Sequence, residues 1–426
     1  MWDCLPDEVL TEKILSRLPV KSIIQCRCVC KSWFSLITTP IFISNYLRNL
    51  NLNLKTQNTQ LFLHQRDYYD KTSGSCALLF DNNEQDYLRP MLLRLLPDGC
   101  IWQHMVGSVN GLICLSGVNP VLDFILFNPS IGRFLSVPHP PFTTTIYTLS
   151  TVMGLGFDES TQDYKILFIV GSRCFIYSLN SNSWRRLITP PLLNSSSSSY
   201  RTQSAVFVNG RFHWLAVHHL GQWNFHCDFI MVFDVKTETF HQISLPECLA
   251  YFQPHQPGLI NARRIMEFGD SSIAAIEPAE YAAHVWVMKE YGLVESWIKL
   301  ATLKLEFYYS PVLGFRNKDE VLILLNPISG AGPVRESECI ISRNINNEEI
   351  KNLMNVEEHS ACIFSRVYKY VPSLVLLDKQ NNFDAPVVDV DVDVDVTPLV
   401  EDEEELRRSK CALAYGLCSE IGQLCH

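Results

Sequence analysis

The residues best equipped for chemistry are the histidines and the cysteine within the segment FHWLAVHHLGQWNFHCDF, which begins at residue 212. Imidazole and thiolate groups bind zinc or transfer protons, so this segment is a candidate metal site or catalytic centre. However, it lacks the spacing of zinc ligands, and the adjacent His218 and His219 would point to opposite faces of a strand. We therefore predict no metal site here, and expect a strand at Trp214 followed by a loop from His218 to Trp223. Exposed rings in such a loop would contact a protein, and the candidate contact residues are Trp214, His218, His219 and Trp223.

A second cluster comprises Cys26, Cys28 and Cys30. Alternate positions on a helix face different sides, so buried reduced thiols are favoured over a metal site. The chain has 15 cysteines, an odd number, and lacks the paired C-x-x-C spacing of zinc knuckles. Reduced thiols indicate the cytoplasm or the nucleus. The apolar runs are too short to cross a bilayer, and the N-terminus lacks the features of a signal peptide.

Motifs for intrinsic catalysis are missing from the sequence. It contains no glycine-rich phosphate loop, no nucleophile elbow and no H-E-x-x-H helix. The sequence therefore predicts a protein that is not an enzyme and carries no cofactor.

The net charge of -10 is concentrated near the C-terminus. Ten acidic residues and no Lys or Arg lie between Asp384 and Glu405, so the rest of the chain balances at 35 acidic and 35 basic residues. A neutral body without a basic patch does not favour nucleic acid. The stretch VVDVDVDVDV could alternate as a strand, but like charges would then share one face, so we expect residues 381–426 to be an acidic, disordered tail. The serines from Ser195 to Ser199 are expected to form a surface loop.

The N-terminal residues that follow Pro6 have helical periodicity. Pro6 suits a first helical turn, and Leu10, Ile14, Leu15 and Leu18 then share one face before Pro19 ends the helix. Ser22 and Gln25 have the spacing of a capping box, which predicts a second helix, and a third would carry Trp33 before Pro40. So small a core usually needs a partner, so some of the apolar residues should meet another protein.

From residue 60 the pattern changes to short apolar runs separated by turn residues, which indicates a mainly β domain. Four runs end in a turn followed by an aromatic residue, at Phe134, Trp184, Phe240 and Trp297. Units repeating at this interval are typical of propeller blades, and the domain length predicts about six of them. Asn110-Gly111 and Asn209-Gly210 predict two-residue hairpin turns.

The segment LPDEVLTEKILSRLPVKSIIQCRCVCKSWFSLITTPIF resembles the F-box of plant F-box proteins, through Leu-Pro, Ile-Leu-x-Arg-Leu-Pro-Val-Lys-Ser and Arg-x-Val-Cys-Lys-x-Trp. The resemblance implies a three-helix module that binds the Skp-family linker of a cullin-based ubiquitin ligase. It places ten residues in or immediately behind the docking surface: Leu5, Pro6, Ile14, Leu15, Leu18, Pro19, Val20, Ile23, Val29 and Trp33. Lys13 departs from the family pattern as an extra residue, which a π-bulge or a shifted entry loop could absorb.

The segments GSVNGLICL, FNPSIGRF, GLGFDESTQDYKIL, VFVNGRFHWL, FDVKTETF and VWVMKEYGLVESWIKL resemble, in this order, the F-box-associated interaction domain, a kelch-like propeller. The expected organisation is an F-box at 1–45, a linker at 46–59, a substrate-binding β domain at 60–380 and the acidic tail. The resemblance implies a substrate adaptor of an SCF-type ubiquitin ligase, partnered by the Skp-family linker and, through it, by cullin and RING subunits. Two alternatives stay open: a propeller enzyme or small-ligand receptor with a helical appendage, and an F-box scaffold that does not promote degradation.

Overall fold

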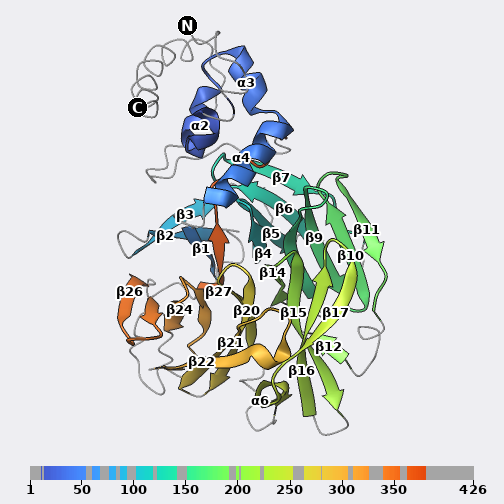
Figure 1. Ribbon diagram of the computed structural model, residues 1–426, viewed down its shortest axis with the longest axis vertical. Helices are drawn as coiled ribbons and strands as arrows, with labels where there is room; N and C mark the ends of the chain where they lie inside the picture. The colour runs from blue at the N-terminus through green and yellow to red at the C-terminus, as the bar shows by residue number, and fades with distance from the viewer. Residues whose placement is uncertain are drawn as a thin grey trace.

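The computed structural model of the protein describes most of the helical and β regions (Figure 1). The described residues are 11, 14–53, 60–67, 76–82, 87–93, 102–118, 122–141, 151–190, 198–200, 203–220, 225–252, 263–279, 281–305, 310–325, 339–355 and 362–379. Leu5, Pro6, Trp223 and the acidic tail lie outside them, as do the predictions made for these residues.

The N-terminal region is a compact helical unit. Its elements are η3 (Leu15–Arg17), α2 (Val20–Cys26), α3 (Lys31–Ile37) and α4 (Pro40–Asn53). Helix α2 begins directly after Pro19, which occupies the N-cap with extended backbone, so Ser22 lies inside the first turn and is not the cap that we expected. The Oγ1 of Thr39 accepts a hydrogen bond from the backbone N–H of Phe42 at 3.2 Å, which caps the start of α4.

Helix α4 is longer than the sequence indicated. Residues 46–53, which we assigned to a linker, continue the helix that begins at Pro40. The reason is packing on two sides: Tyr46 lies in the core of the helical unit and Leu47 lies in a core of the β domain. Beside Lys13, the described residues Thr11 and Ile14 have π-helical backbone, one of the two adjustments expected for an extra residue.

The strands of the described part of the chain form six sheets. Three sheets come from the first half of the β domain. The first contains β4 (Trp102–Val109), β5 (Leu112–Val118), β6 (Leu122–Asn128) and β7 (Arg133–Val137), and the second contains β8 (Thr151–Asp158), β9 (Asp163–Val170), β10 (Arg173–Ser178), β11 (Ser183–Leu187) and β13 (Gln203–Ser204). The third contains β12 (Ser198–Tyr200), β14 (Val206–Val208), β15 (Arg211–Leu220), β16 (Phe225–Asp234), β17 (Thr239–Ser244) and β18 (Tyr251–Phe252). Ser198 and Ser199 thus pair with β15 instead of lying in a loop.

The other three sheets complete the domain. The fourth sheet contains β19 (Arg264–Phe268), β20 (Ser272–Ala279), β21 (Ala282–Met288) and β22 (Trp297–Lys304). The fifth contains β23 (Val312–Phe315), β24 (Glu320–Leu325), β25 (Cys339–Asn344) and β26 (Ile350–Asn355). The last contains β27 (Cys362–Tyr370), β1 (Gln60–Asp67), β2 (Cys76–Asn82) and β3 (Tyr87–Leu93). Two short helices, α6 (Glu247–Ala250) and η6 (Val294–Ser296), lie in the connections. No described helix has the length and apolar character needed to cross a membrane.

The sheets close into a propeller ring. The innermost strands contact one another in the order β4, β8, β14, β19, β23, β27 and back to β4. The closure joins the two ends of the domain, because β27 is antiparallel to β1, with Leu61 opposite Lys369. A closed ring protects the strand edges of the sheets, which explains why this long β domain needs no covering layer of helices.

The repeat found in the sequence corresponds to the fourth strand of each of four sheets. Phe134, Trp184, Phe240 and Trp297 lie in β7, β11, β17 and β22, each opposite a residue of the third strand. The indole N–H of Trp184 donates a 2.6 Å hydrogen bond to the carbonyl of Pro138. These aromatic residues pack within and between the sheets.

The two predicted Asn-Gly turns are confirmed. Asn110 and Gly111 have φ of +52° and +78°, and Asn209 and Gly210 have φ of +52° and +69°. Both turns join the first and second strands of a sheet, and they define one face of the propeller, which we call the helix face. The helical unit lies on it: Ser44 Oγ donates a 3.3 Å hydrogen bond to Gln162 Oε1, in the β8–β9 turn of the same face. We call the opposite face of the propeller, where β15 ends and β16 begins, the far face.

Candidate functional site

The predicted docking residues of the helical unit form mostly its interior. Five of them, Leu15, Leu18, Val20, Ile23 and Trp33, are buried in one core, and Ile14 packs against its edge. These positions therefore lie immediately behind the surface. Pro19 and Val29 are exposed and can contact another protein directly.

An apolar patch remains on the outside of this unit. Val29 is 41% exposed and Phe34 is 48% exposed, and the guanidinium of Arg27 lies 4.8 Å from the centre of the Phe34 ring. An exposed aromatic residue beside an arginine is a common feature of protein interfaces. We call Val29 and Phe34 the α3 patch. Sequence reasoning missed Phe34, although its position next to the buried Trp33 places it off the core face of the helix.

The helical unit is held to the propeller by residues 371–379, which follow β27 and which we call the C-terminal brace. Leu374 and Leu377 insert into the core of the helical unit, while Val375 and Leu376 insert into the core of the sheets β4–β7 and β8–β11. The Asn128 side-chain amide donates hydrogen bonds to the carbonyls of Ser373, at 3.0 Å, and of Val375, at 2.8 Å. The brace therefore belongs to both cores at once.

Helix α4 provides a second attachment. The Tyr46 hydroxyl donates a 2.8 Å hydrogen bond to the carbonyl of Leu18, and burial raises the pKa of this phenol, which stays neutral. One residue further, Leu47 belongs to the same propeller core as Val375 and Leu376 of the brace. Two separate segments thus fix the orientation of the helices on the propeller (Figure 1).

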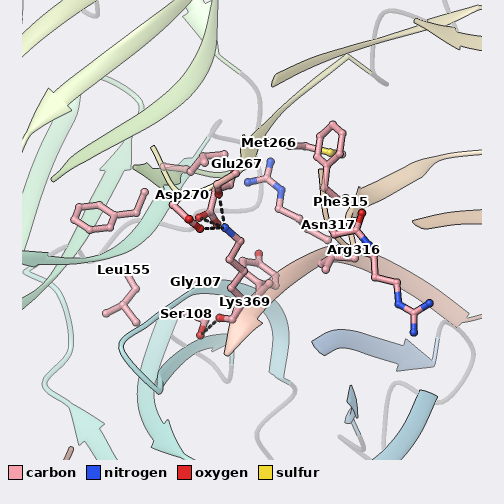
Figure 2. A pocket seen from close by; sticks show the side chains of 18 of the residues that line it. Gly107, Ser108, Leu155, Met266, Glu267, Asp270, Phe315, Arg316, Asn317 and Lys369 are labelled. Atoms are coloured by element: carbon pink, nitrogen blue, oxygen red, sulfur yellow. Dashed lines mark hydrogen bonds and ion pairs between the residues drawn. The ribbon is translucent and has the colours of Figure 1, made fainter. Parts of the chain in front are cut away.

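The propeller channel opens into a cavity of about 320 Å³ (Figure 2). The lining residues come from the inner strands of all six sheets and from turns of the helix face. Its apolar wall includes Leu155, Phe207, Met266 and Phe315. Four basic residues and two acidic residues also line the cavity. They are Arg316, Lys318, Arg366 and Lys369, and Glu267 and Asp270.

The two carboxylates of this cavity share one cation. The Lys369 ammonium lies 3.0 Å from Glu267 Oε1 and 3.3 Å from Asp270 Oδ1, and it also donates to the carbonyl of Gly269 (Figure 2). Burial raises the pKa of Glu267, although Lys369 opposes that rise. Because both carboxylates are engaged by the same ammonium, they are not arranged as a separate acid and base. The described residues contain no group of three side chains able to hold a metal ion.

The histidine segment differs from the expectation. Trp214 is fully buried in the core between two sheets, so it cannot contact a substrate and its assignment as a binding residue is wrong. His218 and His219 continue strand β15, opposite Cys227 and His226 of β16, instead of starting a loop. They lie near the far face, away from the helical unit. His213 is buried: its Nδ1 lies 3.2 Å from the carbonyl of Val206 and its Nε2 lies 2.6 Å from the Tyr291 hydroxyl.

The fold and these sites define a class of protein: a mainly β propeller that carries a rigidly attached N-terminal helical unit and is equipped for binding. Residues 2–45 match the F-box domain, and residues 98–377 match the F-box associated beta propeller domain. The chain belongs to the plant F-box proteins that carry this propeller domain. Its architecture is that of an F-box substrate adaptor.

Relatives from Arabidopsis thaliana support this placement. The chain is 28% identical over 313 residues to F-box/kelch-repeat protein At3g23880, an alignment that covers 70% of this chain and 79% of that protein. It is 32% identical over 251 residues to Putative F-box protein At1g47790, covering 56% of this chain and 58% of that one. The matched propeller extends beyond residues 105–325, where the motifs in the sequence are clearest.

Proposed function

We propose that this protein is the substrate-recognition subunit of an SCF-type ubiquitin ligase, acting in the cytoplasm or the nucleus. In this proposal the helical unit within residues 1–45 binds a Skp-family linker and, through it, cullin and RING subunits. The propeller within residues 60–380 binds a protein substrate. The observation that carries the proposal is an F-box whose exposed α3 patch is held in a fixed orientation on a propeller.

Such a subunit acts by bringing its substrate close to the charged ubiquitin carrier. Holding a substrate near the charged ubiquitin carrier raises its effective concentration, and a fixed orientation restricts which lysines can reach that carrier. A flexible tether would give the effective concentration without the orientation. The brace and α4, which tie the F-box to the propeller through two cores, supply both.

The direct test uses the α3 patch. Val29→Asp and Phe34→Asp, combined, are expected to abolish co-purification with the Skp-family linker, because each places a charge in the centre of an apolar contact. Ile188→Asp, the same change at a 92% exposed residue of the propeller, is the matched control and should leave binding unchanged. Substitutions at Leu18 or Ile23 are less informative, because both are buried and their loss would unfold the unit.

The melting temperature of each variant must stay close to that of the parent for the comparison to hold. If the folded double variant still binds the linker, the α3 patch is not the linker-binding surface. Linker binding absent from the parent protein itself would remove the adaptor function.

The rival class is a propeller enzyme or small-ligand receptor with a helical appendage, and the channel cavity is the place where such an activity would reside. A non-degradative F-box scaffold is the third possibility. Affinity purification with proteasome activity blocked, comparing the parent with the Val29→Asp, Phe34→Asp variant, separates these functions. Proteins that accumulate on the parent and are stabilised by the variant are degraded substrates, whereas bound proteins of unchanged lifetime indicate a scaffold.

A further inference from the structure

The channel cavity has an arginine at its inner end. Arg366 and Lys369 both belong to β27, and Arg366 lies three residues further from the helix face, which is about 10 Å along a strand. Its guanidinium reaches across the channel, donating 3.3 Å and 2.8 Å hydrogen bonds to the carbonyls of Ser204 and Ile265. These carbonyls belong to sheets that are not neighbours of β27 in the ring, so Arg366 forms a floor to the cavity.

The guanidinium of Arg366 forms no ion pair with a carboxylate among the described residues, although the charge of the nearby Glu267 favours the cation. Its two hydrogen bonds go to neutral carbonyls, and a guanidinium carries five N–H donors. Burial lowers the pKa of Arg366, which reflects the cost of this charge in the interior. Glu267 is held by Lys369 and does not form an ion pair with the guanidinium. These two bonds leave three of the five N–H donors for a further acceptor.

The wall above Arg366 combines apolar side chains with the ion pair between Lys369 and Glu267, and the rim is polar. Phe207, Phe315 and Val367 lie on three different strands and are partly exposed in the apolar part of the lining, whereas Leu155 and Met266 are buried in the cores between sheets. The rim carries Ser108 and Asn317 (Figure 2). A cavity of this size lies at the lower end of the range of ligand sites, ~300–1,000 Å³. A cavity with partly exposed apolar side chains and a guanidinium at its inner end is complementary to a hydrocarbon group that ends in a carboxylate.

We propose that the propeller channel binds an apolar carboxylate, with the hydrocarbon part against Phe207, Phe315 and Val367 and the carboxylate on Arg366. The carboxylate would replace water at the unused N–H donors and offset the buried charge. Two sources share this chemistry: a free small organic acid, and the C-terminal carboxylate of a polypeptide that ends in an apolar residue. This inference goes beyond the adaptor function, because it does not depend on what the helices bind.

Isothermal titration calorimetry on the full-length protein tests the site. The probes are octanoate and octanamide, which differ only in the charge, together with a hexapeptide ending in Phe with a free or an amidated C-terminus. Binding of an acid and at least tenfold weaker binding of its amide are expected, since a charge-assisted hydrogen bond contributes about 1.5–3 kcal/mol. If octanoate binds more tightly than the peptide, the natural ligand is a free acid. If the peptide binds more tightly, the natural ligand is a chain terminus. Either result supports the proposal.

Two variants assign the binding to the cavity. Arg366→Met is expected to weaken binding of the acid about tenfold or more without changing that of the amide. Arg186→Met, at an exposed position of the outer strand β11 and outside the cavity lining, is the matched control and should change it less than about twofold. Because Arg366 also joins sheets across the channel, Phe315→Leu provides a second variant that keeps the charge and should weaken both acid and amide.

Three outcomes would overturn the proposal. They are no heat with any probe, equal affinity for acid and amide, and an unchanged acid affinity in a folded Arg366→Met protein. If Arg366→Met does not fold, an unchanged affinity in Phe315→Leu overturns it in the same way.

Discussion

At the scale of single residues, His213 shows how burial sets a charge state. Because Nδ1 faces the carbonyl of Val206, this nitrogen must carry the proton and donate, and Nε2 then accepts from the Tyr291 hydroxyl. Burial lowers the pKa of His213 from 6.5 to about 4, so the imidazole is neutral in the folded protein at neutral pH. The histidine is therefore a core group with two satisfied nitrogens, not a proton-transfer group.

This residue predicts a pH dependence of stability. As the pH falls, the unfolded chain binds a proton at His213 near pH 6.5, whereas the folded protein binds it only near pH 4. The folded state is thus disfavoured progressively between these values. We expect His213 to account for a loss of about 2 kcal/mol in the free energy of unfolding between pH 7.5 and pH 5.

Urea unfolding of the parent and of His213→Gln at both pH values measures the effect. The variant should be less stable at pH 7.5 but should lose about 2 kcal/mol less on acidification. Equal pH dependence in the two proteins would contradict the assignment of a neutral, buried His213.

At the scale of elements, two hairpin turns of the same sequence have different surroundings. Gly111 and Gly210 both have positive φ, so a side chain strains the backbone at either position. A Cβ at Gly111 would collide with the Val371 carbonyl and the Ser373 side chain of the brace, whereas a Cβ at Gly210 meets nothing within 4 Å.

The matched pair of alanine substitutions follows from this difference. Gly210→Ala should lower the free energy of unfolding by about 1 kcal/mol, from backbone strain alone. Gly111→Ala should lower it by about 3 kcal/mol, because overpacking against the brace is added. Chemical denaturation measures both, and equal losses would mean that the brace does not press on this turn.

At the scale of the whole molecule, the brace makes the F-box and the propeller one folded body. Its four apolar side chains, Leu374 to Leu377, are buried in two different cores. Burial of each such side chain contributes about 1.5–3 kcal/mol, a sum comparable with the net stability of a typical protein.

Two truncated chains test this coupling. A chain ending at Lys379 should unfold at nearly the same temperature as the full-length protein, because it keeps every brace contact. A chain ending at Tyr370 keeps strand β27 but lacks the brace, and it should lose more than about 5 kcal/mol or fail to accumulate as folded protein. A stable chain ending at Tyr370 that still binds the linker would show that the brace is dispensable.

The sequence by itself determined the features that depend on near neighbours. The F-box motif, the propeller repeat at Phe134, Trp184, Phe240 and Trp297, and the Asn-Gly turns are all local patterns, and local backbone preferences set turns and strand alternation. The same local reasoning failed at Trp214, because an aromatic residue in a strand has the same pattern whether its face is covered or open.

Only the tertiary structure decided which surfaces remain exposed. Asn128 and the brace meet across 245 residues of sequence, and Arg366 spans the channel to Ser204 and Ile265 of other sheets. The resemblance to the F-box placed both Val29 and Trp33 in or immediately behind the docking surface, but packing buries Trp33 and leaves Val29 and Phe34 exposed. Contacts of this kind depend on where the closed ring brings distant segments, and no local pattern in a single sequence records that.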